Sequence, residues 1–174
     1  MHVAIVTNYL PPRPGGLEGV VDALARAYSE FGDEVIVVGF DDGAGPAPYR
    51  REGLRGWNGL ERRGVPVPIL TPGSLIRLRR VVRDADALHV HGLAFVSSYA
   101  ALLTCRRNPR VVVTEHVGSV PYQSSFASIV LRLAFRIGGG LARRRNVAIT
   151  PLTERVVRPV GALLPRRPRR TIPQ

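Results

Sequence analysis

The stretch that decides the fold is residues 2–40, HVAIVTNYLPPRPGGLEGVVDALARAYSEFGDEVIVVGF. Its opening, HVAIVT (2–7), is apolar enough to predict a buried strand. Residues 17–31 place their apolar side chains on one helical face, and DEVIVVGF (33–40) predicts a second buried strand. No hairpin turn separates these elements, so strand, helix and strand form a βαβ unit. Such a unit requires parallel strands in one sheet.

The same alternation continues along the chain. Because proline cannot donate to a β-ladder, the strand VPVPIL (65–70) is expected near a sheet edge. Residues 41–64 are rich in Gly, Pro and Arg and are interpreted as a long surface excursion. Further strands are predicted at 87–91, 110–116 and 146–150. Further helices are predicted at 73–84, with Ser74 as N-cap, and at 93–107. A last helix is predicted at 124–137, where Gly138, Gly139 and Gly140 break it. The predicted fold class is α/β, a doubly wound, mostly parallel sheet with helices on both faces.

Length and composition are typical of one globular domain. With 174 residues, 45% of them hydrophobic, the chain can bury a sizeable core but does not comfortably hold two domains. We assign residues 1–164 to this domain and interpret 165–174, PRRPRRTIPQ, as a linker because it has no helical pattern. A single cysteine, no secretory signal after Met1 and no apolar run of about 20 residues favour a soluble or peripheral protein of the cytoplasm.

The charge of the chain comes from arginine alone. The sequence has 25 basic residues, none of them lysine, against 13 acids, a formal net charge of +12. This balance favours anionic partners, although a solvated surface with a preference for arginine explains it equally well. The basic helix 74–83 suits contact with the inner face of an anionic membrane, and it equally suits the solvated outer layer of a sheet. No nucleic-acid-binding motif accompanies the charge, so nucleic acid is not an expected partner.

Three predicted loops meet at one edge of the sheet. Ligands of doubly wound sheets bind beyond the carboxyl ends of the strands, which singles out the loops after residues 7, 91 and 116. The first loop ends in Gly15 and Gly16 directly before a helix, where free N–H groups and the helix dipole favour an anion. A loop that only needs positive φ angles would also use these glycines. The predicted substrate-binding residues of the three loops are Asn8, Tyr9, Gly15, Gly16, His91, Gly118 and Ser119.

Histidines provide the candidate chemistry. His116 ends the strand VVVTEH, where its imidazole could donate to a substrate hydroxyl or polarise a leaving group, and we take it as the candidate catalytic residue. A structural hydrogen bond is the alternative. His91 is expected at the rim and His89 in the core or at a cap. These histidines do not have metal-ligand spacing with any cysteine or acid, so no metal site is predicted. Cys105, among apolar residues of a helix, is predicted to be buried.

A dinucleotide-binding domain is the obvious competitor. Asp41 and Asp42 end the second predicted strand, where a ribose-binding acid would lie. The glycines of GGLEG, at 15, 16 and 19, do not form GxGxxG, and seven residues separate Thr7 from Gly15 where a tight turn is needed. A P-loop is excluded because the chain contains no lysine. NAD binding is therefore the weaker reading.

Four stretches of the sequence together resemble one known family. They are IVTNYLPPRPGGLEGVVDALARAYSEFGDEVIVVG, DADALHVHG, RVVVTEHVG and NVAITPLTERV. In this order they are similar to the N-terminal domain of family-4 retaining glycosyltransferases, which have the GT-B fold of two facing Rossmann-like domains. The resemblance extends, with gaps, over nearly the whole chain.

The resemblance implies a reaction and a division of labour. It implies transfer of a sugar from a nucleotide-diphosphate donor to an acceptor hydroxyl with retention at the anomeric carbon, without a further cofactor and usually without a bound metal. Gly15 and Gly16 match the glycine pair that meets the donor diphosphate or the acceptor, and His116 matches the histidine that contacts the transferred sugar. RTIPQ (170–174) resembles the linker into a C-terminal domain that carries most donor contacts and the paired glutamates. A dinucleotide-binding domain and a non-catalytic lobe for anionic ligands remain the alternatives.

Overall fold

The computed structural model describes residues 1–40, 46–59, 61, 67–105, 110–116, 125–145 and 147–151. Several predictions fall outside these residues: the acids Asp41 and Asp42, the loop residues Gly118 and Ser119, and the linker 165–174.

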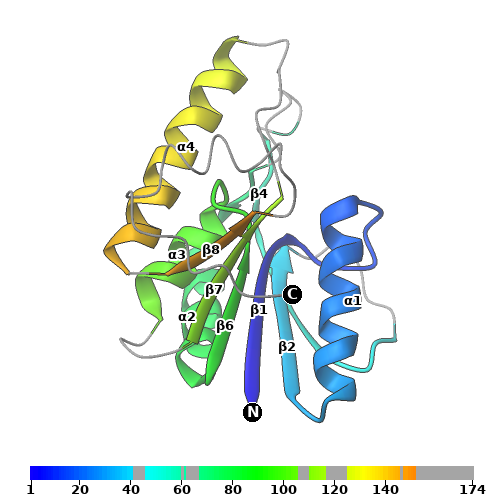
Figure 1. Cartoon of the computed structure of the whole chain (residues 1–174). Coiled ribbons are helices and arrows are strands. Elements are labelled where there is room, and N and C mark those ends of the chain that lie inside the picture. Colours follow the sequence, from blue (N-terminus) through cyan, green and yellow to red (C-terminus); the bar gives the residue numbers. More distant parts are fainter. Residues whose placement is uncertain are drawn as a thin grey trace.

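The domain is built on a six-stranded sheet with the order β3-β2-β1-β6-β7-β8 (Figure 1). Every neighbouring pair in this sheet is parallel. The carboxyl ends of the strands therefore meet at one edge, the upper edge in Figure 1. The strands are β1 (His2–Tyr9), β2 (Glu34–Phe40), β3 (Arg50–Leu54), β6 (Ala87–His91), β7 (Arg110–Glu115) and β8 (Ala148–Pro151).

Helices cover both faces of the sheet, as the sequence predicts. Helix α1 (Gly16–Glu30) packs on one face, and α2 (Pro72–Asp84), α3 (Val96–Thr104) and α4 (Ser125–Arg144) lie on the other. The alternation of side chains along β1 explains the two cores: Val3 and Ile5 pack toward α1, whereas Ala4 and Val6 belong to the core beneath α2 and α3. The doubly wound α/β fold is confirmed.

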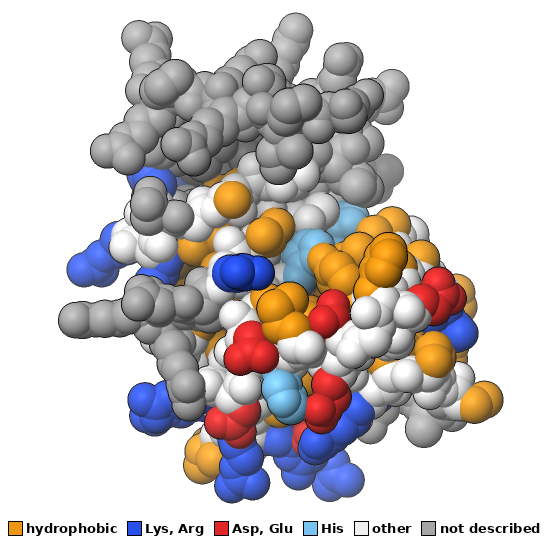
Figure 2. All heavy atoms as spheres, turned by 60° about the horizontal axis from the view of Figure 1, so that its bottom comes forward, with side chains coloured by type: hydrophobic (Ala, Val, Ile, Leu, Met, Phe, Trp, Pro, Cys, Tyr) orange, Lys and Arg blue, Asp and Glu red, His pale blue; other side chains and the backbone are white. Residues whose placement is uncertain are grey.

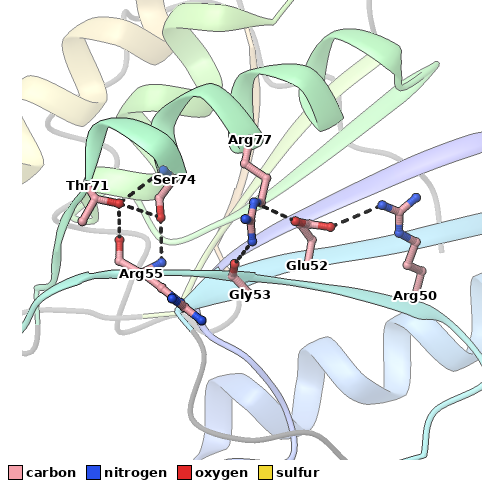
Figure 3. Close-up of polar contacts among 7 residues, drawn as sticks. All are labelled: Arg50, Glu52, Gly53, Arg55, Thr71, Ser74 and Arg77. Atoms are coloured by element: carbon pink, nitrogen blue, oxygen red, sulfur yellow. Dashed lines mark hydrogen bonds and ion pairs between the residues drawn. The ribbon is translucent and has the colours of Figure 1, made fainter.

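The edge strand β3 was missed by the sequence analysis, which placed it within a surface excursion. Its sequence, RREGL, buries only Leu54, so it lacks the apolar run that marks the inner strands. Polar contacts to α2 hold it instead (Figure 3). Arg77 Nε lies 3.2 Å from a Glu52 carboxylate oxygen, and the Arg55 N–H donates to Ser74 Oγ at 2.7 Å. An edge strand stabilised by side-chain polar contacts gives no hydrophobic signal.

Two predicted local features are wrong. The N-cap of α2 is Thr71, whose Oγ1 accepts a hydrogen bond from the Ser74 N–H at 3.3 Å, and the helix begins at Pro72, a favourable first position for proline. Of the predicted strand 65–70, the described part pairs as β5 (Ile69–Leu70) with β4 (Gly56–Trp57) in a separate antiparallel sheet, outside the main one.

Helix α4 passes through its glycines without a break. The sequence predicts an end at Gly138, but the helix continues to Arg144. A Cβ on Gly138 would overlap the backbone carbonyl of Leu93, so this glycine marks a close approach of α4 to the turn before α3. Cys105 is buried at the end of α3, as predicted.

Candidate functional site

The candidate site lies at the carboxyl edge of the three central strands. Asn8 and Tyr9 end β1, His91 ends β6, and His116 follows β7 directly. Because β1, β6 and β7 are neighbours in the parallel sheet, these residues from distant parts of the chain gather at one edge. The structure thus brings together Asn8, Tyr9, His91 and His116 of the predicted set.

Three histidine rings form a continuous stack at this edge. The rings of His89 and His91 are stacked with centroids 4.4 Å apart, and the rings of His91 and His116 with centroids 5.0 Å apart. His89 and His91 are two residues apart on β6, so both side chains point to the α1 face of the sheet. His91 is paired in register with Thr114, which places His116 two residues further along the neighbouring strand and on the same face.

The contact between the outer two rings of the stack joins two ring nitrogens. Nδ1 of His91 lies 2.8 Å from Nε2 of His116. Burial lowers the pKa of His91 to about 2, with the neighbouring His89 and His116 adding to the effect, and burial also lowers the pKa of His116. Both rings are therefore neutral at pH 7, and one nitrogen of the pair donates while the other accepts.

This hydrogen bond couples the tautomers of the two rings. If His91 donates from Nδ1, the neutral His116 ring must carry its own proton on Nδ1, which can then donate to a ligand. If His116 donates from Nε2, its Nδ1 becomes an acceptor. The tautomer of the neutral His91 ring thus decides whether Nδ1 of His116 donates a hydrogen bond to a ligand or accepts one.

Two buried polar atoms face the same region without a partner among the described residues. They are His91 Nε2 and Thr7 Oγ1, and both residues have 0% of their surface exposed. Val6 of β1 is paired with Val90 of β6, so Thr7 and His91 follow one residue later on adjacent strands. His91, expected at the rim, is therefore a fully buried ring beneath His116 and reaches a ligand only through His116.

His89 is tied into the fold rather than into the site. Its Nε2 lies 2.8 Å from Thr114 Oγ1, and its Nδ1 lies 3.5 Å from the Tyr28 hydroxyl of α1. Burial, reinforced by the neighbouring His116, lowers the pKa of His89 to about 4. The interpretation as a core histidine fits these contacts.

Glu115 is a residue that the sequence analysis quoted without giving it a role. It is 1% exposed, and its carboxylate accepts a hydrogen bond from the Leu93 N–H at 2.6 Å. The turn that it holds passes through Gly92, whose φ of +82° is a conformation that glycine adopts readily. Glu115 therefore fixes the chain between β6 and α3. An acid at the end of a buried strand was the available signal, because a buried carboxylate needs a specific partner.

The first loop is braced by residues that were assigned to the surface excursion. The Arg13 guanidinium lies 3.7 Å from the centroid of the Tyr9 ring and its Nη2 lies 2.9 Å from a Glu61 carboxylate oxygen. Asn58 donates from Nδ2 to the Tyr9 hydroxyl at 3.0 Å. The side chains of Asn8 and Tyr9 are consequently buried, with 6% and 4% of the residue surface exposed. Both stay predicted ligand contacts, but the Tyr9 side chain is already engaged by Arg13 and Asn58.

Gly15 and Gly16 differ in what surrounds them. Gly15 is the N-cap of α1, and a Cβ there would overlap the Glu18 carboxylate, which folds back over it. Gly16 is the first residue of the helix, and a Cβ there would have no atom within 4 Å. Both are exposed, and a pocket of about 400 Å³, lined by Gly15 and Gly19 but not by Gly16, opens between the loop, α1 and Arg51. An anion at this helix end would meet free N–H groups but also the Glu18 carboxylate.

The described residues contain no group of three or more His, Cys, Asp or Glu side chains that could hold a metal ion. Within the same ranges, no helix is long and apolar enough to cross a membrane.

The fold defines a Rossmann-like domain, and three stacked histidines lie at the carboxyl edge of its sheet. The chain belongs to glycosyltransferase family 4, whose sequence model matches residues 14–174. It is 30% identical over 150 residues to a GDP-mannose:cellobiosyl-diphosphopolyprenol α-mannosyltransferase of Xanthomonas oryzae pv. oryzae, a match that covers 78% of this chain and 36% of the relative. The chain thus spans about a third of the length of this curated relative.

Two solved structures are similar in fold. An α-glucosyltransferase in complex with UDP and a 13-mer DNA matches with a TM-score of 0.50 and 14% identity, covering 81% of this chain and 34% of its own. A short-chain dehydrogenase/reductase from Burkholderia vietnamiensis matches with a TM-score of 0.51 and 12% identity, over 92% of this chain and 88% of its own. At these identities the likeness concerns the fold alone, which Rossmann-like enzymes of both classes share.

Proposed function

We propose that this chain is the N-terminal, acceptor-side lobe of a retaining glycosyltransferase, which moves a sugar from a nucleotide-diphosphate donor to an acceptor hydroxyl. The observation that carries the proposal is the half-buried His116 at the carboxyl end of β7, hydrogen-bonded to the buried His91 at 2.8 Å. Membership of glycosyltransferase family 4 supports it.

In this proposal His116 is the residue that meets the transferred sugar. Its neutral ring uses Nε2 in the contact with His91, which leaves Nδ1 for a sugar hydroxyl. A donor fixed in advance by a buried partner does not need to reorganise when charge develops in the transition state. Gly16, with open space around its Cα, lets a phosphate or the acceptor approach the N-terminus of α1.

The curated relative suggests which substrates to try first. Its name gives GDP-mannose as donor and a cellobiosyl-diphosphopolyprenol as acceptor. We propose a nucleotide-linked hexose as donor, with GDP-mannose as the first candidate, and an acceptor sugar carried on a lipid diphosphate. Such an acceptor would bring the enzyme to a membrane surface as a peripheral protein of the cytoplasmic face. The second lobe, with most donor contacts and the paired glutamates, is proposed to follow the linker 165–174.

The experiment is a titration of the full-length protein, second lobe included, with GDP-mannose, UDP-glucose and NADH while its melting temperature is recorded. We expect a sugar nucleotide, and not NADH, to raise the melting temperature, because only a ligand that binds the folded state stabilises it. Release of nucleoside diphosphate that depends on a glycolipid acceptor would complete the test. A shift with NADH alone would instead favour the dinucleotide-binding domain, whose fold this chain shares.

A further inference from the structure

Helix α4 exposes a column of large aliphatic side chains. Ile129, Leu133 and Ile137 are 58%, 57% and 45% exposed. They are spaced four residues apart, so they lie one above the other on a single face of the helix. Exposed apolar residues scattered singly need no explanation, but an aligned set on one helix indicates a contact surface.

Arginines form the neighbouring column on the same exposed side. Arg132 and Arg136 are both exposed, each one residue before a member of the aliphatic column, and Arg143 and Arg144 follow in the last turn. The helix, SFASIVLRLAFRIGGGLARR, contains no acid. The opposite edge of the sheet differs: Figure 2 shows acidic and basic side chains side by side there, with ion pairs such as that between the Met1 amino group and Asp33.

The other side of α4 is fixed against the domain, so the exposed face cannot turn inward. The Tyr99 hydroxyl of α3 donates to the Ala134 carbonyl at 2.8 Å, Ala142 is 1% exposed, and Gly138 packs on the Leu93 backbone. In Figure 1 the amino-terminal part of α4 extends beyond the carboxyl ends of the strands, the edge that carries the candidate site.

We propose that this face of α4, defined by Ile129, Arg132, Leu133, Arg136 and Ile137, docks on an anionic lipid surface. Aliphatic side chains would enter the boundary between headgroups and acyl chains while the adjacent arginines pair with lipid phosphates. A second copy of the chain is a poorer occupant, because a symmetric contact would bring acid-free arginine columns together. The docking is inferred from this surface alone. Its role, which is to hold the candidate site near a lipid-linked acceptor, rests on the proposed function.

Helix α2, the helix that the sequence singled out for membrane contact, fits this role less well. Its apolar residues Leu78 and Val82 are 0% and 1% exposed and pack in the core, as in the outer layer of a sheet. It nevertheless exposes Ile76 (64%) beside Arg79 and Arg80. Helix α2 therefore offers a matched control for α4, because an exposed apolar side chain and a neighbouring arginine can be changed there in the same way.

The test is co-sedimentation of the full-length protein with phosphatidylglycerol-containing vesicles and with pure phosphatidylcholine vesicles. We expect binding to the anionic vesicles only. The pair Leu133→Asn with Ile137→Asn should weaken it by about tenfold or more, and Arg132→Gln and Arg136→Gln by about fivefold each. The α2 pair Ile76→Asn with Arg79→Gln should bind as the unchanged protein does. Melting temperatures confirm that each variant is folded.

Three results would overturn the docking proposal: no binding to anionic vesicles, equal binding by the α4 variants, or equal losses in the α2 control. Dimerisation that the α4 changes abolish, without vesicle binding, would identify a second copy as the occupant. Glycosyl transfer to a water-soluble acceptor analogue, measured without vesicles, should survive the α4 changes. Vesicle binding by a protein that transfers no sugar would uphold the docking and reject the proposed function.

Discussion

His91 Nδ1 lies 2.8 Å from His116 Nε2, and the first of these rings is fully buried while the second is only partly covered. This contact makes His91 a positioning residue for the ring that faces the ligand edge. Because Nε2 of His116 is engaged by His91, only Nδ1 of His116 is left for a ligand.

Replacing His91 with phenylalanine tests this positioning role. The ring and its stacking are kept, but His116 loses its hydrogen-bond partner. We expect kcat to fall roughly tenfold or more, the equivalent of one lost hydrogen bond, with KM and melting temperature nearly unchanged. His89→Phe, which alters the other end of the stack without touching the nitrogens of His116, should keep kcat. Equal losses in the two variants would show that the stack acts through packing alone.

Stability should fall as the solution becomes acidic. Burial lowers the pKa of His89 to about 4 and that of His91 to about 2, against about 6.5 in the unfolded chain. Below pH 6.5 the unfolded chain therefore binds more protons. The free energy of unfolding is therefore unaffected by the titration of these histidines above about pH 7. As pH falls further, it decreases by about 1.4 kcal/mol per pH unit for each histidine that stays neutral in the folded protein.

Urea unfolding between pH 7.5 and pH 4.5 measures this slope. His91→Phe should make it shallower, because one depressed group is removed. A slope that His91→Phe does not change would mean that the pKa of His91 is not lowered in the folded protein.

Gly16 offers a test of ligand approach that does not disturb the fold. A Cβ at Gly16 meets no protein atom within 4 Å, and alanine favours a helix over glycine by up to about 1 kcal/mol. We expect Gly16→Ala to keep or raise the melting temperature while lowering kcat/KM. Gly73→Ala, near the start of α2 and equally open, should leave kcat/KM unchanged. Full activity in Gly16→Ala would show that no ligand approaches Gly16 closely and that the glycine serves only the conformation of the loop.

The glycines of α4 should respond oppositely to the same change. Gly138→Ala would place a Cβ against the Leu93 carbonyl, and we expect a loss of about 1–3 kcal/mol in unfolding free energy. Gly140→Ala meets no atom within 4 Å and should stabilise by up to about 1 kcal/mol. Denaturant unfolding of both variants provides the comparison. If both are stabilised, α4 does not pack closely on the turn before α3.

Apolar runs and periodicity sufficed to predict most of the fold. The inner strands β1, β2, β6 and β7 are apolar over most of their length, and α1 carries a clear apolar face, so the parallel sheet could be predicted. Strand β3 could not, because Glu52 and its neighbours obtain their stability from α2 rather than from burial. Gly138 was misread as a helix break because the sequence does not show that Leu93 lies against it.

The candidate site was predictable in its location and less so in its detail. The rule that ligands bind at the carboxyl ends of parallel strands singled out His116 and Gly16, and in the structure they follow β7 and begin α1 at that edge. It could not reveal that His91 is buried beneath His116, since depth below the rim depends on the packing of three strands. The braces of the first loop, Asn58 and Glu61, lie far away in sequence, within a stretch without a periodic pattern.

The most direct test of the account is the kcat/KM of His116→Ala in the full-length protein, with its melting temperature measured beside it. Removing one well-placed hydrogen-bond donor from an active site costs roughly 100- to 1000-fold in rate, and we expect a loss of that size in sugar transfer with little change in melting temperature. His89→Ala, tied to Thr114 and Tyr28, should instead act mainly through a lower melting temperature. A His116→Ala protein with nearly unchanged kcat/KM, or one that loses activity only as it unfolds, would contradict the assignment.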